Sequence, residues 1–127
     1  MNFKLSIVIP VYNNYNFTKS CIDDLMHLPE DHEIIVVDNG STDMTKSLSY
    51  DSSRFKIIRN SSNLGFAKAV NIGYSVSSGE SIMFLNNDIR VRDRKSDWTL
   101  EIINACSGNC LVGPTAGLLD HDLNFVC

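Results

Sequence analysis

Three polar residues, Asn86-Asn87-Asp88, follow an apolar run over residues 82–85. The run predicts a buried strand, which would place the triplet at that strand's carboxyl end. A carboxylate flanked by amides suits a hard divalent cation such as Mg²⁺ or Mn²⁺, which binds substrate phosphates while using only one or two protein carboxylates. Asn and Asp also dominate turns because their side chains hydrogen-bond the local backbone, so a plain polar turn is the alternative for this triplet.

Three other polar loops begin where an apolar strand is predicted to end. They cover residues 10–14 after a strand at 4–9, residues 38–43 after a strand at 33–37, and residues 60–65 after a strand at 55–59. In a parallel sheet the carboxyl ends of the strands share one edge, and ligands bind outside that edge. The four loops together therefore predict a ligand site, although independent surface loops are also polar.

The elements that must position these loops alternate along the chain. Apolar residues at helical spacing predict helices over 16–28, from about 41 to 50, over 66–76 and near 98–103, with a further strand near 111–112. This order predicts an α/β fold, a mostly parallel Rossmann-like sheet with helices on both faces, in a single domain over residues 1–127. The nearly continuous apolar strands agree, because parallel strands are buried on both sides.

Composition excludes several classes of protein. With 127 residues, 43% of them hydrophobic and 20% charged, the chain resembles ordinary globular proteins, and its net charge of −4 gives no support to a nucleic-acid partner. No apolar run approaches the ~20 residues of a membrane span, and no signal-peptide pattern is present. The four cysteines lack Cys-x-x-Cys spacing, which argues against a zinc site and predicts free, mostly structural thiols in a reducing, cytoplasmic setting.

The residue types at the predicted edge suit a nucleotide diphosphate. Asp38 and Asn39 can hydrogen-bond the imide edge of a pyrimidine or a ribose hydroxyl, and Tyr12 can stack on the base, with a place in the core as its alternative. Gly65 would open a helix whose N-terminal amides face a phosphate. A cation at Asp88 would bridge the diphosphate and support a leaving nucleotide.

Two common nucleotide-binding patterns are absent. The chain has no Gly-x-Gly-x-x-Gly after its first strand and no Gly-x-x-x-x-Gly-Lys-Ser/Thr, which excludes ordinary dinucleotide and P-loop sites. A nucleotidyltransferase is a rival because that class shares the sheet arrangement. It usually carries a glycine- and Lys/Arg-rich loop after the first strand, which residues 10–14 lack.

Four segments carry one set of motifs in order. They are residues 6–13 (SIVIPVYN), 36–43 (VVDNGSTD), 63–73 (NLGFAKAVNIG) and 85–88 (LNND). Their order and spacing resemble an inverting family 2 glycosyltransferase of the GT-A fold, and the third segment most resembles the rhamnosyltransferase-like branch. The resemblance spans essentially the whole chain but only the N-terminal, nucleotide-binding half of the family's domain.

The resemblance implies a role for each matching residue. The nucleoside pocket would comprise Pro10, Val11 and Tyr12, the base contacts Asp38 and Asn39, the donor contacts Gly65, Asn71, Asn86 and Asn87, and the metal ligand Asp88. It further implies Mn²⁺ or Mg²⁺ as cofactor, a UDP- or dTDP-linked sugar as donor and a glycan or lipid-linked acceptor. The expected setting is polysaccharide biosynthesis, in the cytoplasm or peripherally at the inner membrane face.

Three positions depart from the family's pattern. Asn86 replaces the first carboxylate of Asp-x-Asp, which predicts weaker metal affinity or contacts moved toward the ribose. Asn39 replaces a frequent second Asp, which predicts an altered base preference. Val70 stands where many relatives have Arg, so one phosphate contact is expected to be missing.

The family's general base and acceptor lobe are expected downstream of Cys127, so the fold is predicted to be truncated at its C-terminus with no catalytic base in the chain. A base at Asp120 or Asp122 is the alternative to a solvated acidic loop. The predicted function is metal-assisted transfer of a sugar, of hexosyltransferase type, from a nucleotide diphosphate to an acceptor hydroxyl with inversion. The alternative is a non-catalytic nucleotide-sugar-binding half-domain, and whether the chain forms a homodimer stays open.

Overall fold

The computed structural model describes residues 2–92, 98–106, 108, 118–119 and 125–126. The chain divides into two compact units, residues 1–96 and 97–127. The strand predicted near 111–112 and the acidic loop with Asp120 and Asp122 lie outside the described residues.

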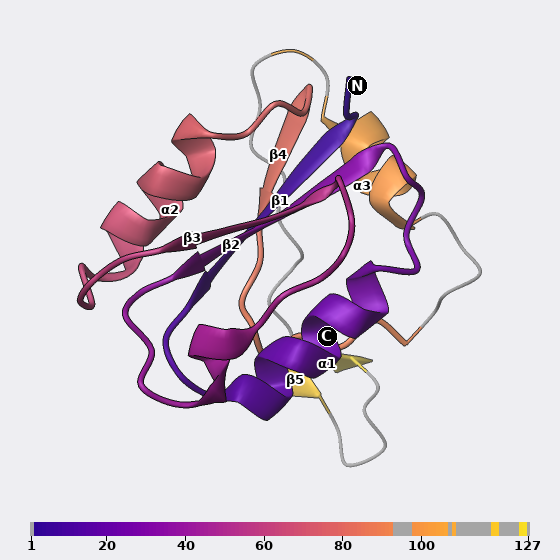
Figure 1. Ribbon diagram of the computed structural model, residues 1–127. Coiled ribbons are helices and arrows are strands. Elements are labelled where there is room, and N and C mark those ends of the chain that lie inside the picture. The colour runs from indigo at the N-terminus through magenta and orange to yellow at the C-terminus, as the bar shows by residue number, and fades with distance from the viewer. Residues whose placement is uncertain (1, 93–97, 107, 109–117, 120–124, 127) are drawn as a thin grey trace. The chain divides into compact units, whose positions relative to one another are not determined.

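The first unit is built on a four-stranded parallel sheet, as the alternating apolar runs predicted. The strands lie in the order β3-β2-β1-β4, with the bounds β1 Leu5–Val11, β2 His32–Asp38, β3 Phe55–Arg59 and β4 Ser81–Phe84. All of β2 is buried, which agrees with its central place in the sheet. Because the strands are parallel, the loops that follow them begin at one edge, called the carboxyl edge below (Figure 1).

Helix α2, Phe66–Ser75, covers one face of the sheet. It packs Ala69 on the buried side chains Val8, Ile35 and Val37. A Cβ atom at Gly73 would lie 2.2 Å from Cγ1 of Val8 and 3.2 Å from Cγ2 of Val37. The helix therefore approaches the sheet this closely because residue 73 has no side chain.

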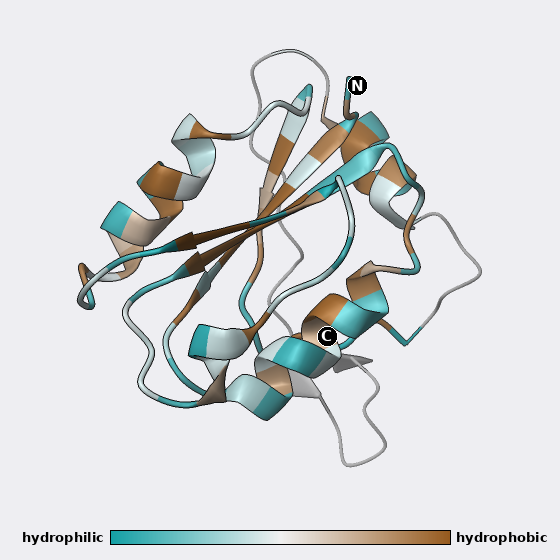
Figure 2. Cartoon of the chain, viewed as in Figure 1, coloured by the Kyte–Doolittle hydropathy of each residue, from teal (hydrophilic) through white to brown (hydrophobic). Residues whose placement is uncertain are grey.

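Helix α1, Tyr15–Leu25, lies on the opposite side of the sheet (Figure 1). Its buried apolar residues are Cys21, Ile22 and Leu25, and apolar colour is concentrated in the strands between the two helices (Figure 2). The prediction of helices on both faces is confirmed.

Helix α1 ends at Leu25 rather than at the predicted Leu28, and a buried side chain binds carbonyls of the segment that follows it. The guanidinium of Arg54, which is 1% exposed, donates to the carbonyl oxygens of Met26, Pro29 and His32. Carbonyls beyond a helix end need such partners when they are buried.

The helix predicted over 41–50 is a single 3₁₀ turn, η1, Met44–Ser47. Its N-cap is Asp43, whose Oδ1 accepts a hydrogen bond of 2.9 Å from the Thr45 amide. Ser41, one of the expected caps, instead accepts a bond of 2.8 Å from the Asn13 amide. The longer prediction was wrong: the turn starts after Asp43 rather than at Ser41, and the backbone is already extended at Leu48.

A buried polar network closes the opposite edge of the sheet, where the strands begin. Glu33 on β2 is fully buried, and its carboxylate accepts bonds from Ser6 (2.5 Å), the Ser78 amide and hydroxyl (2.6 and 2.8 Å) and Lys56 (2.7 Å). Burial alone would raise the pKa of Glu33, but these hydrogen bonds outweigh it and lower the pKa to about 2.

The second unit contains helix α3, Trp98–Ala105, and a short antiparallel pair, β5 Leu118–Leu119 with β6 Phe125–Val126. Of the cysteines, Cys21 is a buried free thiol as predicted, whereas Cys106 is disulfide-bonded, so the prediction of a free thiol was wrong there. Among the described residues, no helix has the length and apolarity that crossing a bilayer requires.

Candidate functional site

The loops after β1 and β2 are joined by side-chain to backbone hydrogen bonds at the carboxyl edge. Oδ1 of Asn13 accepts from the amides of Thr42 (2.8 Å) and Asp43 (3.2 Å). Oδ2 of Asp43 in turn accepts from the Tyr15 amide at 3.0 Å. Asn13 and Asn14 both have positive φ angles, 56° and 61°, a conformation that Asn tolerates better than most residues.

Asp43 is ionised in this arrangement. Burial opposes its ionisation, but hydrogen bonds from Thr45 and Tyr15 outweigh that effect and lower its pKa. The negative charge therefore fixes the start of α1 against the loop after β2.

Asp38 ends β2 and is 2% exposed. Oδ1 accepts a bond of 2.9 Å from the Ser41 amide, and Oδ2 accepts one of 2.8 Å from Nη1 of Arg59. The same guanidinium also donates to the carbonyls of Thr45 and Leu48. Both oxygens of Asp38 thus hold the turn that follows β2, and its predicted contact with a base stays a prediction.

Asn39 is 4% exposed and its side-chain amide joins β2 to the loop before α2. Nδ2 donates to Oδ1 of Asn63 and to the carbonyl of Gly65, both at 3.1 Å. Oδ1 accepts from Nδ2 of Asn60 at 3.0 Å and from the Leu64 amide at 3.2 Å. Two donors and two acceptor positions are the full capacity of an amide side chain, so Asn39 positions this loop with every polar group it has.

Gly65 is the N-cap residue of α2 and has a φ angle of 87°, where glycine is favoured. No atom lies within 4 Å of a Cβ built there. Because the first amides of a helix have no intrahelical partners, the N-terminus of α2 offers donors for an anion at the carboxyl edge.

The segment after β4 leaves the sheet and contacts α1. Sγ of Cys21 donates to the Asn86 carbonyl at 3.9 Å, and Nδ2 of Asn87 donates to Oγ1 of Thr18 at 2.9 Å. Oγ1 of Thr18 also donates to the Asn14 carbonyl at 3.3 Å. Asn87 is thereby linked through Thr18 to the loop after β1.

Asp88 is exposed and makes no hydrogen bond or ion pair with the residues that the structure describes. Asn86 beside it is exposed as well. No group of three or more His, Cys, Asp or Glu side chains that could enclose a metal occurs in the described part of the chain. A single open carboxylate fits Mg²⁺ or Mn²⁺, because such ions fill their remaining positions with water and substrate phosphates.

The remaining candidates fall into different environments. Tyr12 is 47% exposed at the end of β1, so its alternative as a core residue does not hold, whereas Val11 is 2% exposed and its side chain belongs to the core. Pro10, which precedes Val11 in β1, is half-buried. Asn71 is exposed on α2, two residues from both buried positions Ala69 and Gly73, and therefore on the solvent side of that helix.

Sequence reasoning missed several residues that build the edge. Asn13 and Asp43 were noted only as parts of polar loops, although Asn at a turn and Asp before a helix are recognisable signals. Thr18, Asp24 and Arg90 gave no local signal, because their partners lie 66 to 69 residues away along the chain.

The comparisons with known proteins agree with this geometry. The "Glycosyl transferase family 2" model matches residues 6–106. Glycosyltransferase GlyG of Streptococcus pneumoniae is 25% identical over 98% of this chain and 43% of its own length. The poly(ribitol-phosphate) beta-glucosyltransferase of Bacillus spizizenii is 37% identical over 96% of this chain and 24% of its own length. The chain thus spans less than half of these relatives.

Two solved structures share the fold. S. aureus TarS, residues 1–349, superposes with a TM-score of 0.70 at 23% identity, covering 81% of this chain and 33% of that one. The mannosyltransferase PcManGT from Pyrobaculum calidifontis, solved in complex with GDP-Man and Mn²⁺, gives 0.66 at 20% identity over 74% of this chain and 30% of that one. The fold is that of the GT-A glycosyltransferases, as predicted. Because the family model covers most of the chain, the protein belongs to glycosyl transferase family 2.

Proposed function

We propose that the carboxyl edge binds the nucleotide diphosphate of a sugar donor, and that this family member transfers the sugar to an acceptor hydroxyl with inversion. Family membership supports glycosyl transfer. The PcManGT complex with GDP-Man and Mn²⁺ supports a nucleotide sugar and a divalent cation as ligands. The single observation that carries the proposal is the open carboxylate of Asp88 at the end of a parallel sheet whose neighbouring loops are tightly fixed.

Each part of the edge would meet one part of the donor. Tyr12 offers an exposed ring on which a base stacks, and the N-terminus of α2 offers amides to a phosphate. Asp88 would hold Mn²⁺ or Mg²⁺, and a bound cation of this kind stabilises the charge that develops on a departing diphosphate. Asp38 and Asn39 hold the loops that carry these groups, and their contact with the base stays a prediction.

The first experiment tests the metal ligand. Asp88→Asn should remove the Mn²⁺-dependent part of UDP, dTDP or GDP binding in calorimetry without lowering the melting temperature, because Asp88 has no intramolecular partner among the described residues. Asp51→Asn is the matched control, since Asp51 is also exposed but precedes β3 and so belongs to the opposite edge. Equal Mn²⁺-dependent binding by the protein and the Asp88 variant would overturn the assignment.

A second candidate function is nucleotide-sugar binding without transfer. The observation that favours it is coverage: the chain matches only 43% of the length of GlyG and 24% of the length of the Bacillus enzyme. Incubating residues 1–127 with UDP-glucose or GDP-mannose, Mn²⁺ and a mixture of glycan acceptors separates the two functions. Transfer requires a general base that reaches the acceptor proton, so release of nucleoside diphosphate together with glycosylated acceptor would support transfer. Nucleotide binding without such release would support the binding function.

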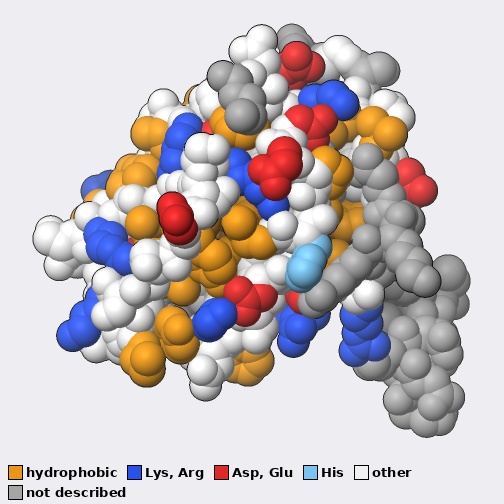
Figure 3. Space-filling view, turned by 45° about the vertical axis from the view of Figure 1, so that its right-hand side comes forward, with side chains coloured by type: hydrophobic (Ala, Val, Ile, Leu, Met, Phe, Trp, Pro, Cys, Tyr) orange, Lys and Arg blue, Asp and Glu red, His pale blue; other side chains and the backbone are white. Residues whose placement is uncertain are grey.

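Three further parts of the proposal concern setting and assembly. We place the reaction in polysaccharide biosynthesis, in the cytoplasm or at the inner face of the membrane, with a glycan or lipid-linked acceptor. The face shown in Figure 3 carries interspersed acidic and basic side chains rather than a continuous basic surface, which gives no support to nucleic-acid binding. A homodimer is tested by light scattering, which reports the mass of the particle in solution.

A further inference from the structure

A buried carboxylate on α1 faces the segment that follows β4. Asp24 is 2% exposed. Its Oδ2 accepts from Nε of Arg90 at 2.7 Å and from the Val91 amide at 3.0 Å, and its Oδ1 accepts from Nη2 of Arg90 at 3.3 Å. The two oxygens and the guanidinium therefore form a bidentate pair, which fixes orientation as well as distance.

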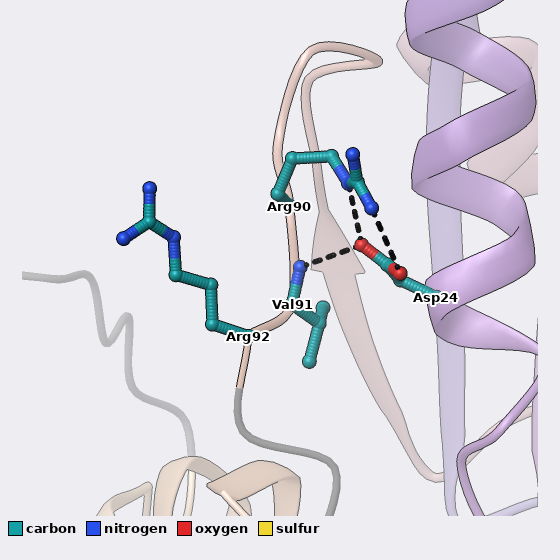
Figure 4. Close-up of a pocket in the computed structure, with 4 residues that line it drawn as sticks. All are labelled: Asp24, Arg90, Val91 and Arg92. Carbon is teal, nitrogen blue, oxygen red and sulfur yellow. Dashed lines mark hydrogen bonds and ion pairs between the residues drawn. The ribbon is translucent and has the colours of Figure 1, made fainter.

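Figure 4 shows how the residues of this pair lie. The guanidinium of Arg90 is turned toward the Asp24 carboxylate, whereas the side chain of Arg92 points away from it. The four residues drawn line a hollow of about 350 Å³ beside α1. The Arg90 side chain is 56% exposed, so the buried charge of the pair is that of Asp24.

Burying an ionised carboxylate is unfavourable unless hydrogen bonds and an opposite charge compensate it. Here Arg90 and the Val91 amide, 66 and 67 residues along the chain, contribute to that compensation. Asp24 therefore selects one register of the segment after β4, because a shift along α1 would leave its charge without these partners.

Asp88 lies between two anchors of this segment. On one side Asn87 bonds Thr18, and on the other Arg90 and Val91 bond Asp24. Thr18 and Asp24 both belong to α1, so a single helix holds the backbone before and after Asp88. The exposed carboxylate has no partner of its own among the described residues, and its position is set by these neighbours.

We propose that Asp24 and Arg90 are positioning residues for Asp88: the pair fixes the segment after β4 on α1 and so places the open carboxylate ready for a divalent cation. This role rests on the proposed function of the carboxyl edge. Groups that orient a metal ligand without touching the metal typically change metal affinity by about 10- to 100-fold when they are removed.

The test compares two arginines in one segment. Arg90→Ala removes the pair, while Arg92→Ala removes the same charge from a side chain that points away from Asp24 (Figure 4). Asp24→Asn is the second disrupting variant, and it leaves no buried charge unpaired because the Arg90 side chain is exposed to solvent. Each protein is titrated with UDP, dTDP and GDP, with and without Mn²⁺, and amide exchange of residues 86–91 is followed by NMR without ligand.

We expect Arg90→Ala and Asp24→Asn to weaken Mn²⁺-dependent binding by about 10- to 100-fold, with metal-free binding unchanged and amide exchange of residues 86–91 accelerated. Arg92→Ala should bind and exchange like the unmodified protein. Arg90→Lys keeps the positive charge but cannot make two parallel hydrogen bonds to Asp24, so its affinity should lie between those of the unmodified protein and Arg90→Ala. Equal loss of metal-dependent and metal-free binding, or unchanged exchange in the two disrupting variants, would overturn the positioning role.

The two proposals fail in different ways. If the unmodified protein shows no Mn²⁺-dependent nucleotide binding, the proposed function is wrong. Asp88 then binds no cation, and the Asp24–Arg90 pair has no role in binding either. If the unmodified protein binds and Arg90→Ala binds equally well, only the positioning role falls. Amide exchange then shows whether the pair holds the segment at all.

Discussion

At the scale of single residues, burial separates the side chains that organise the carboxyl edge from Asp88, which is open to solvent. Asp38 and Asn39 are 2% and 4% exposed and direct their polar atoms into the protein. Asp88 is exposed and has no such bonds among the described residues. A buried polar group that loses its partner costs about 1–3 kcal/mol, so we expect substitutions at Asp38 and Asn39 to lower stability, whereas the role proposed for Asp88 predicts an effect on binding.

Asn39→Asp tests this division. The carboxylate cannot donate to the Gly65 carbonyl or to Oδ1 of Asn63, and it would place oxygen opposite oxygen at both contacts. We expect the free energy of unfolding, measured by urea denaturation, to fall by about 2–3 kcal/mol. Asn71→Asp makes the same change on the solvent side of α2 and should alter it by less than about 0.5 kcal/mol; similar losses for both variants would contradict the role of Asn39.

At the scale of elements, the packing of α2 on the sheet decides where its N-terminus lies. The contact depends on Gly73, above Val8 of β1 and Val37 of β2. Valine in a buried strand has little rotamer freedom, so Val8 cannot move aside for a methyl group. The helix would have to rise from the sheet, which would also move the amides next to Gly65.

Gly73→Ala should therefore destabilise the protein even though alanine favours helix by about 1 kcal/mol over glycine. We expect a net loss of about 1–3 kcal/mol in the free energy of unfolding. The double variant Val8→Ala/Gly73→Ala restores room for the methyl group, so it should lose less than the sum of the single variants, with a coupling of at least about 0.5 kcal/mol. Additive losses would show that the close approach at Gly73 does not limit the packing.

At the scale of the whole molecule, the two edges of the sheet carry different kinds of polar structure. The edge where strands begin is held by Glu33, which joins β2 to Ser6 of β1, Lys56 of β3 and Ser78 before β4. Its hydrogen bonds are all made inside the protein and support the assembly of the sheet. The carboxyl edge instead ends in an open carboxylate, which is the arrangement expected of a binding site.

Glu33 also predicts how stability depends on pH. Its pKa falls from 4.5 to about 2 on folding, so it stabilises the protein fully above pH 4.5, and that contribution is lost as pH falls through about 2. The contribution is at most about 3 kcal/mol, since Lys56 is partly exposed. The loss of stability between pH 5 and 2 should be smaller in Glu33→Gln by this amount, measured by urea denaturation; parallel pH profiles would contradict the linkage.

Much of the fold follows from local sequence patterns. Apolar runs and helical spacing located β1, β2, β3, β4, α1 and α2 in the correct order, because burial on both faces of a parallel strand and on one face of a helix leaves a repeating trace in the sequence. The ends were less accurate. Helix α1 ends at Leu25, three residues early, and η1 begins after its Asp43 cap while Ser41, an expected cap, bonds Asn13 instead.

By itself, the sequence determined which loops reach the carboxyl edge, since parallel pairing follows from the alternation of strands and helices along the chain. Only the tertiary structure decided what each polar side chain in those loops does. The side-chain amide of Asn39 hydrogen-bonds residues that lie 21 to 26 positions away in the sequence. Asp24 pairs with Arg90, which lies 66 positions away. Such bonds depend on distances that folding creates and leave no periodic pattern in the chain, so the same residue type is buried and hydrogen-bonded in one loop and exposed in another.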